Sequence, residues 1–96
     1  MTIDDIRQEI DRLDADLLRI FNERADLALR IGRIKKEKGL AVYDPSREKE
    51  IFRRMRENNP GPLDDQAVVR LFERVIDESR RLERLKTSGL SGGEEE

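Results

Sequence analysis

Apolar residues recur every three or four positions through the first third of the chain. This spacing places their side chains on one face of an α-helix, and we call these positions the apolar seam. We expect the helix to run from about Asp4 to Lys38 and to end at Gly39, with basic residues in its last turns. The seam consists of Ile3, Ile6, Ile10, Leu13, Leu17, Ile20, Leu27, Ile31 and Ile34.

Two shorter helices are expected after the first. Asp44 followed by Pro45 forms a good N-cap and first-turn pair, so a second helix begins there and ends near Asn58, where the sequence NNPGP indicates a turn. A third helix begins with a cap at Asp64 or Asp65. Its expected buried stripe is Val68, Phe72, Val75, Ile76, Ser79 and Leu82.

The third helix should end at about Lys86. Residues 1–86 are then one all-α domain of three helices, and residues 87–96, with the sequence TSGLSGGEEE, are a flexible Gly/Ser/Glu tail or linker. The first helix would be roughly 52 Å long, whereas a compact chain of this size has a radius of gyration of about 13 Å. Because the remaining residues are too few to cover such a rod, we expect a second chain to pack against it.

Composition narrows the possible chemistry. Cysteine and histidine are both absent, which excludes disulfides, thiol nucleophiles, histidine bases and the usual zinc sites, so we expect no metal and no cofactor. Charged residues make up 44% of the chain, but both signs are interspersed and no basic block predicts nucleic-acid binding. No long apolar run or signal-peptide pattern is present, so a cytoplasmic protein without membrane association is expected.

An arginine interrupts the apolar seam. The position between Ile20 and Leu27 that should be apolar is Arg24, and a guanidinium there is costly unless an anion meets it. Lys35 lies eleven residues later, only about 20° away around the helix axis. Arg7 belongs to the same face but lies about 25 Å before Arg24, so it could reach the same ligand only from an antiparallel second chain.

The other two helices also carry polar residues on their apolar faces. Asp44, Arg47 and Glu48 precede the core positions of the second helix, and Ser79 and Glu83 extend the stripe of the third. Each alone has an ordinary explanation, such as a snorkelling side chain, a helix-dipole contact or a small packing residue. Their occurrence together predicts a water-poor pocket, lined by Arg and Lys, that suits a small dicarboxylate. Confinement and preorganised charge would then be its catalytic devices.

The segment IRQEIDRLDADLLRIFNERADLALRIGRIKKEKGLAVYDPSREKEI, with RLFERVIDESRRLE later, resembles the all-helical (AroQ) class of chorismate mutases over about residues 3–86. The resemblance implies an intertwined, domain-swapped-like homodimeric helical bundle of three-helix protomers. The implied reaction is the intramolecular Claisen rearrangement of chorismate to prephenate, in the biosynthesis of phenylalanine and tyrosine. The segments DPSREKE and NNPGPL further resemble mutase domains associated with, or fused to, 3-deoxy-D-arabino-heptulosonate 7-phosphate synthase.

The resemblance also implies a role for each candidate residue. Arg24 and Arg47 would bind substrate carboxylates, and Arg7 would come from the other protomer. Lys35 would bind a carboxylate and the ether oxygen, and Ser79 would help at a carboxylate. Asp44 and Glu48 would hold the substrate hydroxyl, as implied by the same match.

Glu83 occupies a position where some members of the family have glutamine. The ether oxygen gains negative charge as its C–O bond breaks, and a carboxyl group donates a hydrogen bond only when protonated. We therefore expect activity to favour acidic pH unless the pocket raises the pKa of Glu83. Two alternatives remain open from the sequence: an isochorismate–pyruvate lyase of similar fold, and a helical dimerisation or regulatory module without activity.

Overall fold

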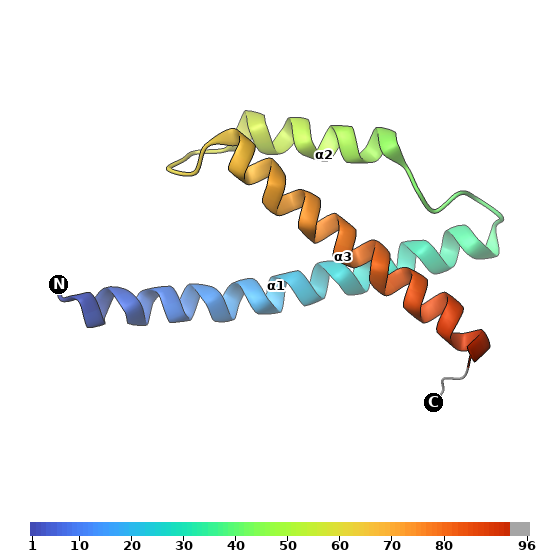
Figure 1. Cartoon of the computed structure of the whole chain (residues 1–96), viewed down its shortest axis with the longest axis horizontal. Coiled ribbons are helices and arrows are strands. Elements are labelled where there is room, and N and C mark those ends of the chain that lie inside the picture. Colours follow the sequence, from blue (N-terminus) through green and yellow to red (C-terminus); the bar gives the residue numbers. More distant parts are fainter. Residues whose placement is uncertain (93–96) are drawn as a thin grey trace.

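Three helices make up the described part of the protein. The computed structural model describes the backbone of residues 1–92 and the side chains of residues 1–86. The helices are α1 (Ile3–Glu37), α2 (Pro45–Asn58) and α3 (Asp65–Gly92), and no strand occurs within residues 1–92 (Figure 1). The predicted all-α fold class is thereby confirmed.

The two ends of α1 are fixed by local hydrogen bonds. At its start, the side chains of Thr2 and Asp5 each accept from the other residue's backbone N–H, a capping box. At its end, Gly39 has a φ of 69°, which favours glycine, and the N–H of Leu40 donates to the Lys35 carbonyl over 2.7 Å. This Schellman-type reversal directs the following loop back alongside the last turns of α1.

Carboxylates cap the other two helices, as predicted. Oδ1 of Asp44 accepts from the N–H of Arg47 over 3.1 Å, and Oδ1 of Asp64 accepts from the N–H of Ala67 over 2.7 Å. In the connection between α2 and α3, the Asn59 side chain donates to the Leu63 carbonyl over 2.7 Å. These bonds set where α2 and α3 begin and how the chain turns between them.

The predicted end of the third helix was wrong. We expected it near Lys86, but the backbone of α3 stays helical to Gly92. The expectation treated the Ser and Gly residues after Lys86 as helix breakers. A helical glycine is unfavourable by only about 1 kcal/mol relative to alanine, and no proline follows, so the helix continues. Residues 93–96 of the predicted flexible tail lie outside the described residues.

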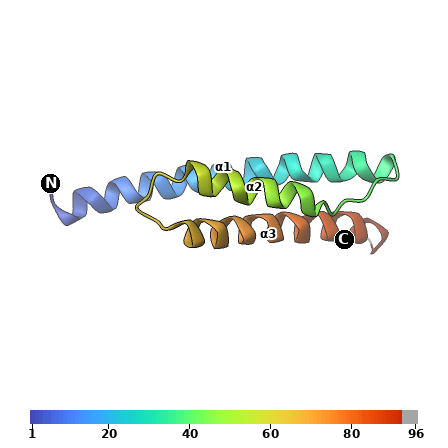
Figure 2. The ribbon, with the colours of Figure 1, turned by 90° about the horizontal axis from the view of Figure 1, so that it is seen from above.

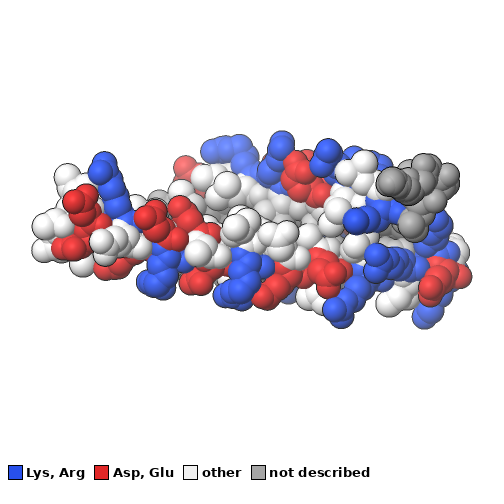
Figure 3. All heavy atoms as spheres, turned by 90° about the horizontal axis from the view of Figure 1, so that it is seen from below, with Lys and Arg blue, Asp and Glu red and all other residues white. Residues whose placement is uncertain are grey.

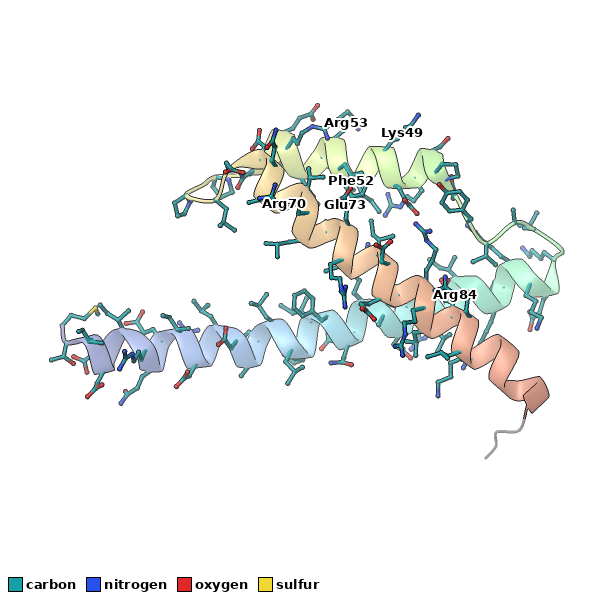
Figure 4. The ribbon with its side chains drawn as sticks, viewed as in Figure 1. Lys49, Phe52, Arg53, Arg70, Glu73 and Arg84 are labelled. Carbon is teal, nitrogen blue, oxygen red and sulfur yellow. The ribbon has the colours of Figure 1, made fainter. Side chains whose placement is uncertain are left out.

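The third helix packs against both of the others. In Figure 1 it returns from α2 and crosses the C-terminal half of α1, and Figure 2 shows α1 and α3 in separate layers. Leu29, Ile51 and Ile76 are the buried apolar residues, one from each helix. Phe52 is half-buried and lies between α2 and α3, whereas Lys49 and Arg53 project from the other side of α2 (Figure 4). The core therefore lies where the helices meet, along one side of α3.

The N-terminal half of α1 extends beyond this core (Figure 1). Its seam residues are between 46% and 68% exposed in the single chain. The radius of gyration is 16.9 Å, against about 13 Å for a compact chain of this length, and the extents are 53 × 34 × 16 Å. One chain therefore leaves much of its apolar seam in water. The residues concerned are Ile3, Ile6, Ile10, Leu13 and Leu17.

The charged side chains cover the outer surface in alternation. Figure 3 shows basic and acidic groups interspersed along the molecule, without a block of one sign on that face. Several form pairs one helical turn apart, such as Arg19 with Glu23 at 3.1 Å. Within residues 1–92, none of the helices is both long and apolar enough to cross a membrane.

Candidate active site

A cavity of about 340 Å³ lies where the three helices and the loop after α1 come together. Its walls include apolar groups from all three helices, among them Leu27, Ile51 and Ile76. Seven of the eight candidate residues also line it, so the structure brings them together. These are Arg24, Lys35, Asp44, Arg47, Glu48, Ser79 and Glu83.

The cationic side of the cavity is formed by Arg24, Lys35 and Arg47. Arg24 is half-buried and has no ion pair or hydrogen bond among the described residues. Its burial, and secondarily the like charge of Arg47, lower the pKa of the Arg24 guanidinium below its ordinary value. A ligand carboxylate placed here would relieve both unfavourable effects.

Lys35 and Arg47 are held differently. Nζ of Lys35 is 3.4 Å from the Val42 carbonyl, so the loop after α1 supports the ammonium group. Arg47 is 52% exposed at the cavity edge and pairs with Glu50, its Nη1 lying 2.6 Å from the carboxylate oxygen. Hydrogen bonding to Arg47 in turn lowers the pKa of Glu50. The cavity is therefore open to water on the side of Arg47.

The first turn of α2 contributes two carboxylates. Asp44 uses one oxygen as the helix cap, which fixes its side chain at the cavity wall. The Glu48 side chain is 20% exposed and forms an ion pair with Arg80 of α3. Both are positioned acceptors for a hydroxyl group of a ligand.

Glu83 enters the cavity from α3 beside α1. Burial raises the pKa of its carboxyl group, and the positive charges of Lys35 and Arg80 offset part of this rise. The close approach depends on Gly32 of α1, which is buried. A Cβ added at Gly32 would lie 3.2 Å from Oε2 of Glu83, tighter than ordinary contact. The raised pKa extends the pH range over which the Glu83 carboxyl group is protonated and can donate a hydrogen bond into the cavity.

Ser79 and Arg7 complete the candidate set. Ser79 is 8% exposed and lines the cavity one turn before Glu83. Arg7 is exposed and is not part of the cavity, because it lies about 25 Å along α1 from Arg24. Within one chain, the structure does not bring Arg7 to the other candidates.

Sequence reasoning missed three residues at the site. Arg80 and Tyr43 line the cavity, and Gly32 shapes it. Arg80 follows Ile76 by four residues, so helical spacing could have placed it on the buried stripe. Gly32 could have been noticed as a costly glycine in the middle of a long helix. Nothing in the sequence pattern distinguishes Tyr43 from other loop residues.

The arrangement suits a small anionic ligand. Four cationic side chains line the cavity together with apolar groups. Two carboxylates at the start of α2 can accept from a hydroxyl group, and Glu83 can donate when it is protonated. Such a set binds carboxylates and stabilises negative charge that develops on an oxygen atom. The geometry defines an electrostatic site for a reaction within one bound molecule.

Comparison with known proteins identifies the class. Residues 6–84 match the chorismate mutase type II family, and the chain belongs to that family. The chorismate mutase of Thermus thermophilus has a closely similar structure, with a TM-score of 0.83 and 39% sequence identity over 85% of this chain and 93% of that one. The family assignment confirms the resemblance seen in the sequence.

Curated relatives occur both alone and within longer proteins. The chorismate mutase of Methanocaldococcus jannaschii is 32% identical over 83% of this chain and 82% of its own length. The bifunctional chorismate mutase/prephenate dehydratase of Neisseria gonorrhoeae is 43% identical over 95% of this chain. The chain spans only about a quarter (26%) of the length of that bifunctional relative.

Gly32→Ala tests the close contact between α1 and α3. Alanine favours a helix interior by about 1 kcal/mol over glycine, so we expect thermal stability to be kept or raised. The new Cβ would crowd the Glu83 carboxyl group, so kcat/KM for a reaction at this cavity should fall roughly tenfold. Thermal unfolding and turnover are measured on the same preparation. A variant that loses stability but keeps its turnover would contradict this explanation.

Proposed function

We propose that this chain converts chorismate to prephenate in one intramolecular step at the cavity between its three helices. The observation that carries the proposal is the convergence of Arg24, Lys35, Arg47 and Glu83 on one cavity of about 340 Å³. In this rearrangement a C–C bond forms as the ether C–O bond breaks, and no group is transferred to the protein. The enzyme has only to confine the substrate and stabilise the charge of the transition state.

The cations bind the two carboxylates of the substrate in this proposal. Arg24 and Arg47 each hold a carboxylate, with Ser79 as an additional donor. The guanidinium fork matches a carboxylate in two parallel hydrogen bonds, and Arg24 has no protein carboxylate beside it among the described residues. Binding both ends of the molecule holds the two reacting carbon atoms near each other.

The remaining groups act at the hydroxyl and at the ether oxygen. Asp44 and Glu48 accept from the ring hydroxyl. Lys35 and protonated Glu83 donate to the ether oxygen, which becomes more negative as its bond to carbon breaks. Because these donors interact most strongly with the charge of the transition state, they lower the barrier rather than merely bind substrate.

We also propose that two chains form an antiparallel homodimer along α1. The exposed seam supports this, because fully burying a Leu or Ile side chain contributes about 1.5–3 kcal/mol and these residues still expose roughly half of theirs. The open edge of the cavity beside Arg47 supports it too, because the partner's α1 would cover that edge. The partner's Arg7 would then complete the cationic side of the site.

The register of this pairing follows from residue numbers. Placing the partner's Arg7 beside Arg24 centres the two antiparallel helices between residues 15 and 16, since (7 + 24)/2 is 15.5. In this register the seam positions from Ile3 to Leu27 of one chain lie against the same stretch of the other. One register thus serves both the burial of apolar surface and the completion of two equivalent sites.

We also propose that residues 1–86 form the catalytic domain and that residues 87–96 form a tail or linker. A cytoplasmic location and an association with 3-deoxy-D-arabino-heptulosonate 7-phosphate synthase also belong to this proposal, and both rest on sequence features alone.

The first test is turnover by the purified chain and by Arg24→Leu. The wild type should consume chorismate, which is measured by the change in ultraviolet absorbance. It should yield prephenate as the product. Arg24→Leu should lose at least about 100-fold in kcat/KM while its unfolding temperature stays equal or rises, because an apolar side chain suits the seam better than an unpaired guanidinium. A folded wild type that forms no prephenate would refute the mutase. Release of pyruvate from isochorismate would instead indicate the lyase.

Mixed dimers test the shared site. Arg7→Ala and Arg24→Ala chains should each be nearly inactive. Refolded together in equal amounts, they form mixed dimers in which one of two sites is intact, so about a quarter of wild-type activity should return. Light scattering establishes the mass of each preparation. If the mixture stays as inactive as its components while being dimeric, Arg7 does not act across the interface.

Glu83→Gln tests the role of the carboxyl group. Only protonated Glu83 donates, so wild-type kcat/KM should decline as the pH rises through the Glu83 pKa, which burial raises. The amide donates at every pH, so the variant should show no such decline between pH 5 and 8. Glu78→Gln, on the exposed side of α3, is the control and should keep the wild-type profile. An identical profile for Glu83→Gln and wild type would exclude this role.

A further inference from the structure

Arg80 joins three segments of the site through one side chain. Its guanidinium forms an ion pair with Glu48 of α2, and its Cζ lies 4.7 Å from the ring centroid of Tyr43 in the loop after α1. The Arg80 and Glu48 side chains are 32% and 20% exposed. The resemblance to known mutases gave no role to Arg80.

This ion pair differs from the surface pairs of the protein. Pairs such as Arg19–Glu23 join exposed residues one turn apart on the same helix and contribute little. The Arg80–Glu48 pair joins α3 to α2 and is largely shielded from water, so removing Arg80 would leave the Glu48 carboxylate without its counter-charge. The Tyr43 ring also lies against the guanidinium and restrains it.

Arg80 is poorly placed to be a further carboxylate ligand. Its guanidinium contacts a ring and a carboxylate that is largely shielded from water, whereas the Arg47–Glu50 pair is about half-exposed and Arg24 has no carboxylate partner among the described residues. What Arg80 can fix is the direction in which the Glu48 oxygens face. An acceptor held in place before binding discriminates more sharply between hydroxyl positions, because it need not be ordered by the ligand.

We propose that Arg80 is a positioning residue that holds Glu48 for the substrate hydroxyl and thereby makes the site selective for the position of that hydroxyl. This inference rests on the proposed function. Arg80 acts through Glu48, so its contribution should appear only with a substrate that carries the hydroxyl group. A residue with a general structural role would affect all substrates alike.

The test compares Arg80→Gln with Arg81→Gln on two substrates. Arg81 is the adjacent arginine, 63% exposed and 3.9 Å from Glu78, so its variant controls for charge and helix position. The substrates are chorismate and an analogue without the ring hydroxyl. Arg80→Gln should lose roughly 10- to 100-fold in kcat/KM for chorismate and no more than about 3-fold for the analogue. Arg81→Gln should match the wild type on both.

Two further variants keep the test decisive. Glu48→Ala and the double variant Glu48→Ala/Arg80→Gln should lose similar amounts, because Arg80 has no acceptor left to position once the Glu48 carboxylate is removed. Should Arg80→Gln fail to fold, Arg80→Lys takes its place, since it keeps the charge but loses the planar fork, and the same substrate difference is expected.

The outcomes separate the two proposals. Equal losses on chorismate and the analogue, with an active wild type, would overturn the positioning role and leave the mutase standing. An inactive wild type would overturn the proposed function and this inference with it. A loss confined to chorismate supports both.

Discussion

The close packing of α3 on α1 at Gly32 is the contact on which the site depends. The third helix is the element that packs against both of the others, so its position sets how far α2 lies from α1. Glycine at position 32 leaves room for the Glu83 side chain to lie against α1, where burial favours its protonated form. With a Cβ at this position, the Glu83 side chain would have to give way. The distance between two helices thus determines the chemistry of one carboxyl group.

In the single chain, the positive charge of Arg24 at the cavity is not balanced by a protein carboxylate among the described residues. Arg24 is half-buried near the like charge of Arg47, and both effects disfavour its cationic form. Such a cluster lowers the stability of the unliganded protein and is relieved when an anion binds. The binding free energy of a dicarboxylate therefore includes the removal of this repulsion. The two acids at the start of α2 already have partners, Asp44 in the backbone N–H of Arg47 and Glu48 in Arg80, and both can accept from a neutral hydroxyl group.

The sequence predicted much of this architecture because its signals are local. The spacing of apolar residues and the helix-capping residues predicted where α1 and α2 begin and end. Polar residues on the apolar faces of the helices predicted seven of the residues that line the cavity. What could not be predicted depends on how the helices cross. Helical spacing from Ile76 favours Arg80 over the adjacent Arg81 for the buried face, but only the packing of α3 against α2 brings Arg80 to Glu48. The end of α3 was misjudged because a glycine weakens a helix without ending it.

The length of α1 and its exposed apolar seam link the stability of the protein to its proposed catalysis. A helix of 35 residues exposes a seam that one chain of this size cannot cover, so the same apolar surface that is unfavourable in the monomer would drive association. A charged interruption of that seam is costly unless it meets an opposite charge. Arg24 meets none among the described residues, whereas a substrate carboxylate would supply one. If the partner's Arg7 joins it, assembly concentrates still more positive charge at the site. Dimer formation would then strengthen substrate binding through charge that a monomer could not hold together.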